Sequence, residues 1–322
     1  MSHRVFATLS WVAVSLLAVA APGQAQDYPA RPIRAIVGAA AGGGSDVFLR
    51  VLGDELQKRW GQPVIVENRP GGAFNIASRA CAEAPPDGYT ICILPNDPIV
   101  YNQFLFKNLQ FDPENGLAPI TKVFHLTHVL VVNPSLNVKT VPELIALAKT
   151  KPLSYGTFPL PLALYMEKLK RDNGIDWVRV PFRGGGEMAN AVLSGSTPIA
   201  FLGISNVMAQ LQGGLMTPLA VDGDARSPLF PDVPTLVETG HRDKPLRSWF
   251  GLFAPAGTPE AIVTKLAGEV ARIVDDPAFR QRNLLALGLE PAVNAPNDFA
   301  RQIRQERPIA QNMVKEAGLQ PQ

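Results

Sequence analysis

Short apolar runs alternate with segments of helical periodicity along most of the chain. The first run, 33–37, leads into a glycine-rich turn, and the segment after that turn has apolar residues on one helical face, at Val47, Val51, Leu52 and Leu56. Further apolar runs follow at 64–67, 89–94, 129–132, 153–156, 178–182, 199–202, 219–221 and 249–254. Strand, turn and helix in repetition predict an α/β protein built on largely parallel sheets.

The C-terminal quarter of the chain is mostly helical in pattern. It has a predicted helix over 260–275, another from Pro277 to a stop at Gly288, and a last one starting near Asn297. These helices need a sheet to cover, and the first sheet is the available partner. We therefore expect a discontinuous first lobe, 26–126 plus 249–322, and a second lobe, 127–248, with chain crossings that act as hinges.

The first 25 residues have the layout of a secretory signal peptide. His3 and Arg4 precede an apolar run over 5–21, and small residues at Gly23 and Ala25 come before the predicted cleavage point. An uncleaved membrane anchor is the alternative, although a run of about 17 residues is short for a membrane-spanning helix. We predict an exported, periplasmic protein.

Composition narrows the class of protein. The 322 residues are 46% hydrophobic, carry a formal net charge of +2 and include 2 cysteines, which excludes a disordered chain and a disulfide-framework miniprotein. A nearly neutral chain with 7% aromatic residues also argues against nucleic-acid binding. Export makes a disulfide between Cys81 and Cys92 possible. Spacing alone does not show it, and two buried thiols are the expected state.

Two glycine-rich turns at strand ends carry the candidate chemistry. Gly42 to Gly44 leads into a helix N-terminus, where free N–H groups and the helix dipole favour a carboxylate or phosphate. Asp46 either caps that helix or lines the site, and both alternatives stay open. The segment 183–186, Arg-Gly-Gly-Gly, offers a second such turn from the other lobe, so a clamp between the lobes is predicted.

Catalytic motifs are missing from the sequence. It has neither G-x-G-x-x-G nor a P-loop lysine after the glycine turn, and no G-x-S-x-G elbow. His125 and His128 lack metal-ligand spacing and are expected to be core or hinge residues. We therefore expect no catalytic residues, no metal site and no cofactor. A small-molecule hydrolase remains a less favoured alternative.

Seven blocks of the mature chain match one known family in order. They are 28–34, 42–46, 61–71, 86–90, 180–184, 230–235 and 254–259. The block 61–71, Gly-Gln-Pro-Val-Ile-Val-Glu-Asn-Arg-Pro-Gly, is the most specific of them. On these blocks the mature chain resembles the solute-binding proteins of tripartite tricarboxylate transporters, also called the Bug receptor family.

The resemblance implies a two-lobed, flytrap-like fold of the type II periplasmic-binding-protein kind, with a mixed or mostly parallel sheet in each lobe. It also implies a non-enzymatic, monomeric receptor that captures a small organic acid and presents it to a membrane permease. Such receptors hold one carboxylate through backbone groups of the first turn and ordered waters. The positions carried over are Ala39, Ala40, Gly42, Gly43, Gly44, Ser45, Asp46, Phe74, Asn75, Asn96, Asp97, Thr157, Phe158, Arg183, Gly184 and Ser205.

Departures from the family pattern suggest the kind of ligand. The family usually has Pro, Phe and Pro where this chain has Gly38, Ala39 and Ala41, a change expected to widen the pocket. Over 157–165, apolar residues replace the usual hydroxyl residues that would bind a second carboxylate. Our hypothesis is a ligand with one carboxylate and an apolar or aromatic body. The alternative is that Phe158, Leu160 and Leu162 pack into the lobe core.

Two roles fit a solute-binding receptor equally well on sequence alone. Solute-dependent closure of the lobes serves delivery to a transporter, and it serves signalling to a membrane sensor in the same way. Transport is the favoured prediction because of the family resemblance, and signalling is kept as the alternative.

Overall fold

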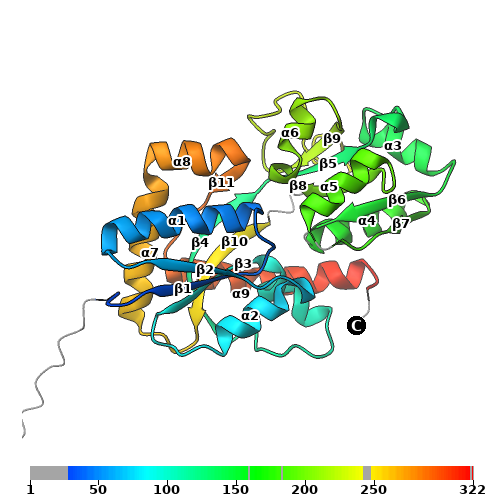
Figure 1. Cartoon of the computed structure of the whole chain (residues 1–322). Coiled ribbons are helices and arrows are strands. Elements are labelled where there is room, and N and C mark those ends of the chain that lie inside the picture. The colour runs from blue at the N-terminus through cyan, green and yellow to red at the C-terminus, as the bar shows by residue number, and fades with distance from the viewer. Residues whose placement is uncertain (1–27, 159, 183, 242–247, 320, 322) are drawn as a thin grey trace, which may run out of the picture.

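Eleven strands form two mixed sheets in the part of the chain that the computed structural model describes, residues 28–158, 160–182, 184–241, 248–319 and 321. The first sheet has the order β11-β4-β10-β3-β1-β2 and the second has the order β7-β6-β8-β5-β9. The predicted signal peptide lies outside the described residues. Figure 1 shows two lobes, each with a sheet covered by helices, which confirms the predicted α/β fold class.

The first sheet is assembled from two separate parts of the chain, 33–126 and 249–291. Its strands are β1 (Ile33–Val37), β2 (Val64–Asn68), β3 (Thr90–Pro95), β4 (Leu117–Leu126), β10 (Trp249–Pro255) and β11 (Leu289–Pro291). Strand β1 pairs in parallel with β2 and β3, whereas β10 pairs antiparallel with β3 and β4. The late strands β10 and β11 thus lie in the first sheet. The residue limits given above for the two lobes remain a prediction.

Helices cover both faces of the first sheet. They are α1 (Gly44–Trp60) and α7 (Glu260–Asp275) on one face, α2 (Asn75–Ala82) and α9 (Pro296–Glu316) on the other, and α8 (Pro277–Asn283) beside them. Neighbouring residues of a strand point to opposite faces of the sheet: Val37 packs with α1 on one face, and Ile36 packs with α2 on the other. Strands β3 and β10 are buried along their whole length, which is why they read as continuous apolar runs.

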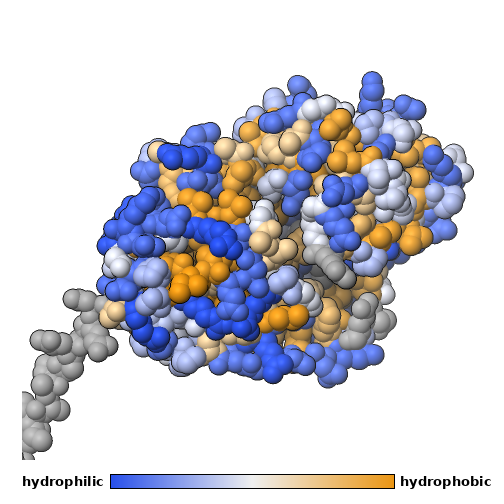
Figure 2. Space-filling view, in the orientation of Figure 1, coloured by the Kyte–Doolittle hydropathy of each residue, from blue (hydrophilic) through white to orange (hydrophobic). Residues whose placement is uncertain are grey.

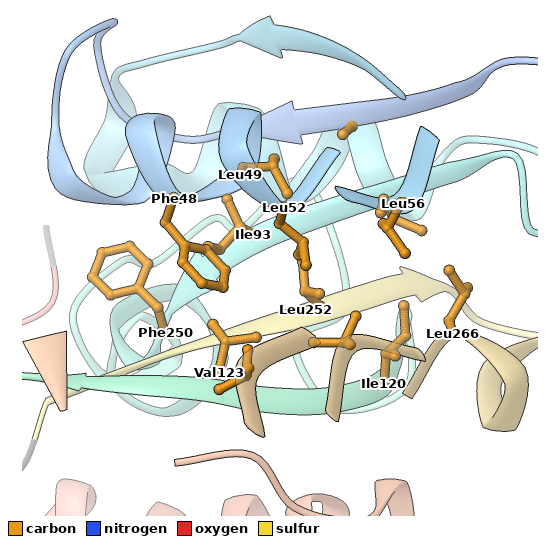
Figure 3. Close-up of a cluster of buried hydrophobic side chains, with 14 of the residues drawn as sticks. Phe48, Leu49, Leu52, Leu56, Ile93, Ile120, Val123, Phe250, Leu252 and Leu266 are labelled. Carbon is orange, nitrogen blue, oxygen red and sulfur yellow. The ribbon is translucent and has the colours of Figure 1, made fainter. Parts of the chain in front are cut away.

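The buried face of α1 differs at two positions from the predicted stripe, because Phe48 and Leu49 take the place of Val47 and of the half-buried Val51. Phe48, Leu49, Leu52 and Leu56 are fully buried and point toward the sheet, as Figure 3 shows, whereas Val47 is 37% exposed. The sequence pattern missed β4 and β11 as strands. Strand β4 begins among polar and proline residues, so it carries no clear alternation, and β11 spans only Leu289–Pro291.

The second sheet contains β5 (His128–Val132), β6 (Leu153–Thr157), β7 (Trp177–Arg179), β8 (Ile199–Gly203) and β9 (Thr217–Asp222). Its helices are α3 (Val141–Ala148), α4 (Leu160–Asn173), α5 (Gly185–Ser194) and α6 (Met208–Gln212). The predicted cap is present: the Glu143 N–H donates to Thr140 Oγ1 at 3.3 Å. The return bond of the capping box is shifted by one residue, since Glu143 Oε2 accepts from the N–H of Lys139, before the N-cap, at 2.7 Å. None of the helices in the described ranges is long and apolar enough to cross a bilayer.

Hydrogen bonds tie the two sheets together where β4 passes into β5. The Ile204 N–H donates to the carbonyl of Thr127 at 2.9 Å, and Thr127 Oγ1 donates to Glu290 Oε1 at 2.9 Å. The next residue, His128, is fully buried, with Nδ1 3.5 Å from Asp222 Oδ2. His128 is thus a core residue of the crossing, as expected.

Cys81 and Cys92 form a disulfide, so the expectation of two buried thiols is wrong. Cys81 lies in α2 and Cys92 in β3, and both are fully buried in the same cluster. Helix α2 packs directly on the strand that follows it, which brings the two Cα atoms to 6.2 Å, a separation that a disulfide spans. Sequence spacing did not reveal this packing.

Candidate functional site

The carboxyl-terminal edges of the two sheets face each other. In the first lobe, β1 and β3 run in parallel and end at one edge, and in the second lobe β6 and β8 do the same. Across the junction, the ring centroids of Phe74 and Phe158 lie 5.4 Å apart. Pale and orange residues gather where the lobes meet in the space-filling view (Figure 2). Turns from both lobes therefore meet at one place.

The start of α1 lies directly against the second lobe. A Cβ atom built on Gly44 would lie 3.5 Å from Ser205 Oγ and 3.8 Å from Leu289 Cδ2. The first helical hydrogen bond is donated by the Val47 N–H to the Gly43 carbonyl. The N–H groups of residues 44–46 therefore precede the helical ladder, and such groups carry the partial positive charge of the helix N-terminus. This is the chemistry expected of an anion site.

Two N–H groups of the glycine turn are already used, contrary to the expectation that its amides are free. The Gly42 N–H donates to Asp46 Oδ2 at 2.9 Å, and the Gly43 N–H donates to the Ala40 carbonyl at 3.4 Å. Gly42 has φ of +84°, a left-handed conformation that glycine adopts without strain. The turn closes on itself, and the amides of 44–46 remain the anion-binding candidates.

Asp46 does not cap α1, whose N-cap is Gly43 without a side-chain cap hydrogen bond; its carboxylate instead binds the turn that precedes the helix. Its side chain is 3% exposed and accepts hydrogen bonds from the Gly42 N–H, from Asn68 Nδ2 at 2.9 Å and from Arg50 Nε at 3.1 Å. Burial by itself would raise the pKa of Asp46, but the hydrogen bonds from Arg50, Gly42 and Asn68 outweigh it and leave the pKa below its usual value. Asp46 is therefore ionised at neutral pH.

Asn68, at the end of β2, was missed as a site residue. Its amide nitrogen donates both to Asp46 and to the carbonyl of Ala39, the latter at 3.0 Å. It thereby connects both ends of the first turn. Asn68 lies in the block 61–71, which carries the most specific family resemblance, so a signal was present, but its contact with the turn appears only in the folded chain.

Phe74 fills the space beside the first turn. Its side chain is 3% exposed, and a Cβ atom on Gly38 would lie 2.4 Å from Phe74 Cδ1. Gly38 therefore makes room for this ring, and its missing side chain does not widen the pocket as expected. Phe158 packs against clusters of both lobes, whereas Leu162 is fully buried in the core of the second lobe. The side chain of Leu160 lies outside the described residues.

Two buried polar groups at strand ends have no hydrogen-bond partner among the described residues. They are Asn96 Oδ1, after β3, and Thr157 Oγ1, at the end of β6. Asn96 is 1% exposed and Thr157 is 6% exposed. Buried polar atoms are nearly always satisfied, so each such atom needs an explanation. Both residues are among the ligand contacts implied by the family resemblance.

The remaining residues predicted to bind the ligand differ in burial and in the contacts they already make. Asp97 is buried in the turn after β3. Asn75 Oδ1 accepts from Asn102 Nδ2 at 2.7 Å. Ala40 lies exposed on the turn. Gly184 is half-buried at the start of α5, next to Gly185, which packs on Asn206, and Arg183 lies outside the described residues. In the described ranges, no group of three or more His, Cys, Asp or Glu side chains is placed to hold a metal ion.

Two α/β lobes whose strand ends meet across a junction define the class of two-lobed binding proteins. The model of the tripartite tricarboxylate transporter family receptor matches residues 48–319. A UPF0065 protein of Bordetella pertussis is 32% identical over 313 residues, which cover 96% of each chain. The chain therefore belongs to the tripartite tricarboxylate transporter receptor family, as the sequence blocks indicated.

Solved structures of similar proteins agree with this assignment. The structure of R. palustris Rpa4515 with adipate has a TM-score of 0.87 and 30% identity, covering 92% of this chain and all of its own. MatC from Rhodopseudomonas palustris with bound malate has a TM-score of 0.79 and 27% identity, covering 89% of this chain and all of its own. One of these structures holds adipate and the other malate, and this chain, a receptor by its family, shares their fold.

Proposed function

We propose that the protein binds a small organic acid between its lobes, with a carboxylate at the amides that begin α1. The observation that supports this most directly is the approach of Gly44 at the N-terminus of α1 to Ser205 of the second lobe. A carboxylate there would accept hydrogen bonds from N–H groups of the first lobe and from the hydroxyl of Ser205 in the second lobe. Ligand binding would thereby stabilise the closed arrangement of the lobes.

The apolar part of the ligand is proposed to lie against Phe74 and Phe158. These rings come from different lobes and already contact each other, so an apolar body beside them would be buried by closure. Burial contributes about 25 cal/mol per Å² of apolar surface before ordering costs. Asn96 and Thr157 would bind a polar group of the ligand, because their buried oxygens need partners.

The proposed setting is the periplasm, after removal of residues 1–25, and the proposed partner is the membrane permease of a tripartite tricarboxylate transporter. The basis is the receptor family to which the chain belongs. A role in signalling to a membrane sensor remains the alternative and would use the same closure. The receptor family to which the chain belongs weighs against the hydrolase alternative.

The ligand class can be tested with protein as purified. Mass spectrometry of the ligand released from freshly prepared protein is expected to show a carboxylic acid. Calorimetry with benzoate, adipate, malate and citrate should then show tighter binding of the acids with apolar bodies. If citrate or malate binds tightest, the apolar-body proposal is wrong while the carboxylate site stands. Release of a ligand without an acid group, together with no binding by any of the four acids, would overturn both.

Replacing Phe158 tests the apolar contact separately. The Phe158→Ala variant is expected to bind acids with apolar bodies about 10-fold more weakly, because an aromatic contact and buried surface are lost. The matched control is Phe230→Ala, since Phe230 is also half-buried against the same cluster of the second lobe. Equal effects of the two variants in calorimetry would assign Phe158 to the lobe core.

A further inference from the structure

We propose that Arg50 makes the start of α1 usable as an anion site by neutralising Asp46, without touching the ligand itself. This inference rests on the function proposed above. It concerns a side chain that the family resemblance did not include among the ligand contacts. The reasoning starts from a conflict of charges within the first turn.

Asp46 places a negative charge where a second negative charge is expected to bind. It is the third residue of α1, its side chain is buried, and its carboxylate already accepts the Gly42 N–H. A ligand carboxylate at the amides of 44–46 would lie within the same helical turn. Like charges at such separations repel each other, and poor access to water makes the repulsion stronger. An unpaired Asp46 would therefore weaken the binding of any carboxylate.

Arg50 cancels this charge from one helical turn further along. Its Nη2 lies 2.9 Å from Asp46 Oδ1, and its Nε lies 3.1 and 3.2 Å from the two carboxylate oxygens. Arg50 Nη2 also donates to Asn68 Oδ1 at 2.9 Å, so the guanidinium is held by two partners. The side chain of Arg50 is 48% exposed, and the hydrogen bonds of its guanidinium go to the side chains of Asp46 and Asn68.

Among the described residues, Arg50 is the charged side chain that pairs with Asp46. Asn68 and the Gly42 N–H are neutral donors. The acidic neighbour on β2, Glu67, is paired with Arg34 and Arg69. Those arginines hold the pKa of Glu67 low, so it stays charged and engaged with them at neutral pH. The charge balance of the first turn therefore depends on the single pair between Asp46 and Arg50.

The test is carboxylate affinity in Arg50→Gln, measured by calorimetry at low salt with the tightest acid of the panel above. We expect about 10-fold weaker binding at pH 7, because Asp46 is left without its counter-charge. The matched control is Arg59→Gln. Arg59 is another arginine of α1, but it lies near the C-terminal end of the helix and forms an ion pair with Glu269 at 2.9 Å. The control is expected to bind like the wild type.

Two further readouts separate a charge effect from damage to the fold. As the pH falls and Asp46 takes up a proton, the affinities of Arg50→Gln and the wild type should converge; the readout is the ratio of the two affinities, because protonation of the ligand weakens binding to both proteins alike. The added change Asp46→Asn should restore affinity at pH 7. Arg50→Lys keeps the charge but loses the two-point contact with Asp46, so its affinity should fall between those of the wild type and Arg50→Gln. If Arg50→Gln binds like the wild type, or if its loss is the same at every pH and is not restored by Asp46→Asn, the inference is wrong. If the wild type binds no carboxylate, the proposed function fails instead.

Discussion

Gly44→Leu is expected to weaken carboxylate binding by about 10- to 100-fold, since overpacking a close contact costs roughly 1–3 kcal/mol. The contact is the one between the start of α1 and the second lobe, where even a Cβ atom would lie 3.5 Å from Ser205 Oγ. A leucine side chain extends further than a Cβ and has to displace Ser205 or Leu289. The lobes would therefore close less fully around the ligand.

The prediction is checked by calorimetry together with small-angle scattering, which reports lobe closure. Gly44→Ala adds one carbon at ordinary contact distance, so it should bind within a few fold of the wild type. Gly268→Leu is the matched control, because Gly268 lies exposed in α7 with open space around it. Unchanged affinity in Gly44→Leu would show that the lobes do not close on this contact when the ligand binds.

Removing the disulfide is expected to lower the free energy of unfolding by about 3 kcal/mol. Cys81 and Cys92 are separated by 11 positions, so the bond closes a short loop and restricts the unfolded chain. The Cys81→Ala/Cys92→Ala variant should show this loss in urea denaturation, and the wild type unfolded and refolded in reductant should lose a similar amount.

The two measurements control for each other. The reduced wild type keeps both sulfur atoms in the buried cluster, whereas the double variant removes them, so any extra loss in the double variant reports lost packing. Equal stability of the oxidised and reduced wild type would contradict the prediction. Carboxylate affinity at 25 °C should change little in either form, because the bond joins α2 to β3 within one lobe.

The sequence correctly predicted the elements whose signals lie within a few neighbouring residues. Four consecutive apolar residues, 129–132, follow His128 in strand β5, and the Thr140 cap of α3 depends on residues three positions apart. Such signals are complete within a few residues. Strand β4 was missed because its pairing with β10 joins segments more than a hundred residues apart, and the local composition of 117–121 is ambiguous.

The candidate site shows the same division. The glycine turn before α1 was recognisable, because a run of glycines ahead of an amphipathic helix is a local pattern. The contacts of this turn could not be predicted from the local sequence. Asn68 donates to the turn from the neighbouring strand, and Phe74 fills the space beside Gly38 from the next turn. The disulfide was misjudged for the same reason, as the approach of α2 to β3 is a matter of packing.

The sequence by itself determined the family, the α/β class and the position of the glycine-rich turn at which we propose that an anion binds. Each is written in ordered motifs and in the alternation of apolar and polar residues. Only the tertiary structure decided which amides of that turn are already bonded, which aromatic rings meet across the lobes and which arginine balances Asp46. These depend on distances between segments remote in the chain, and burial sets the strength of the charge interactions there.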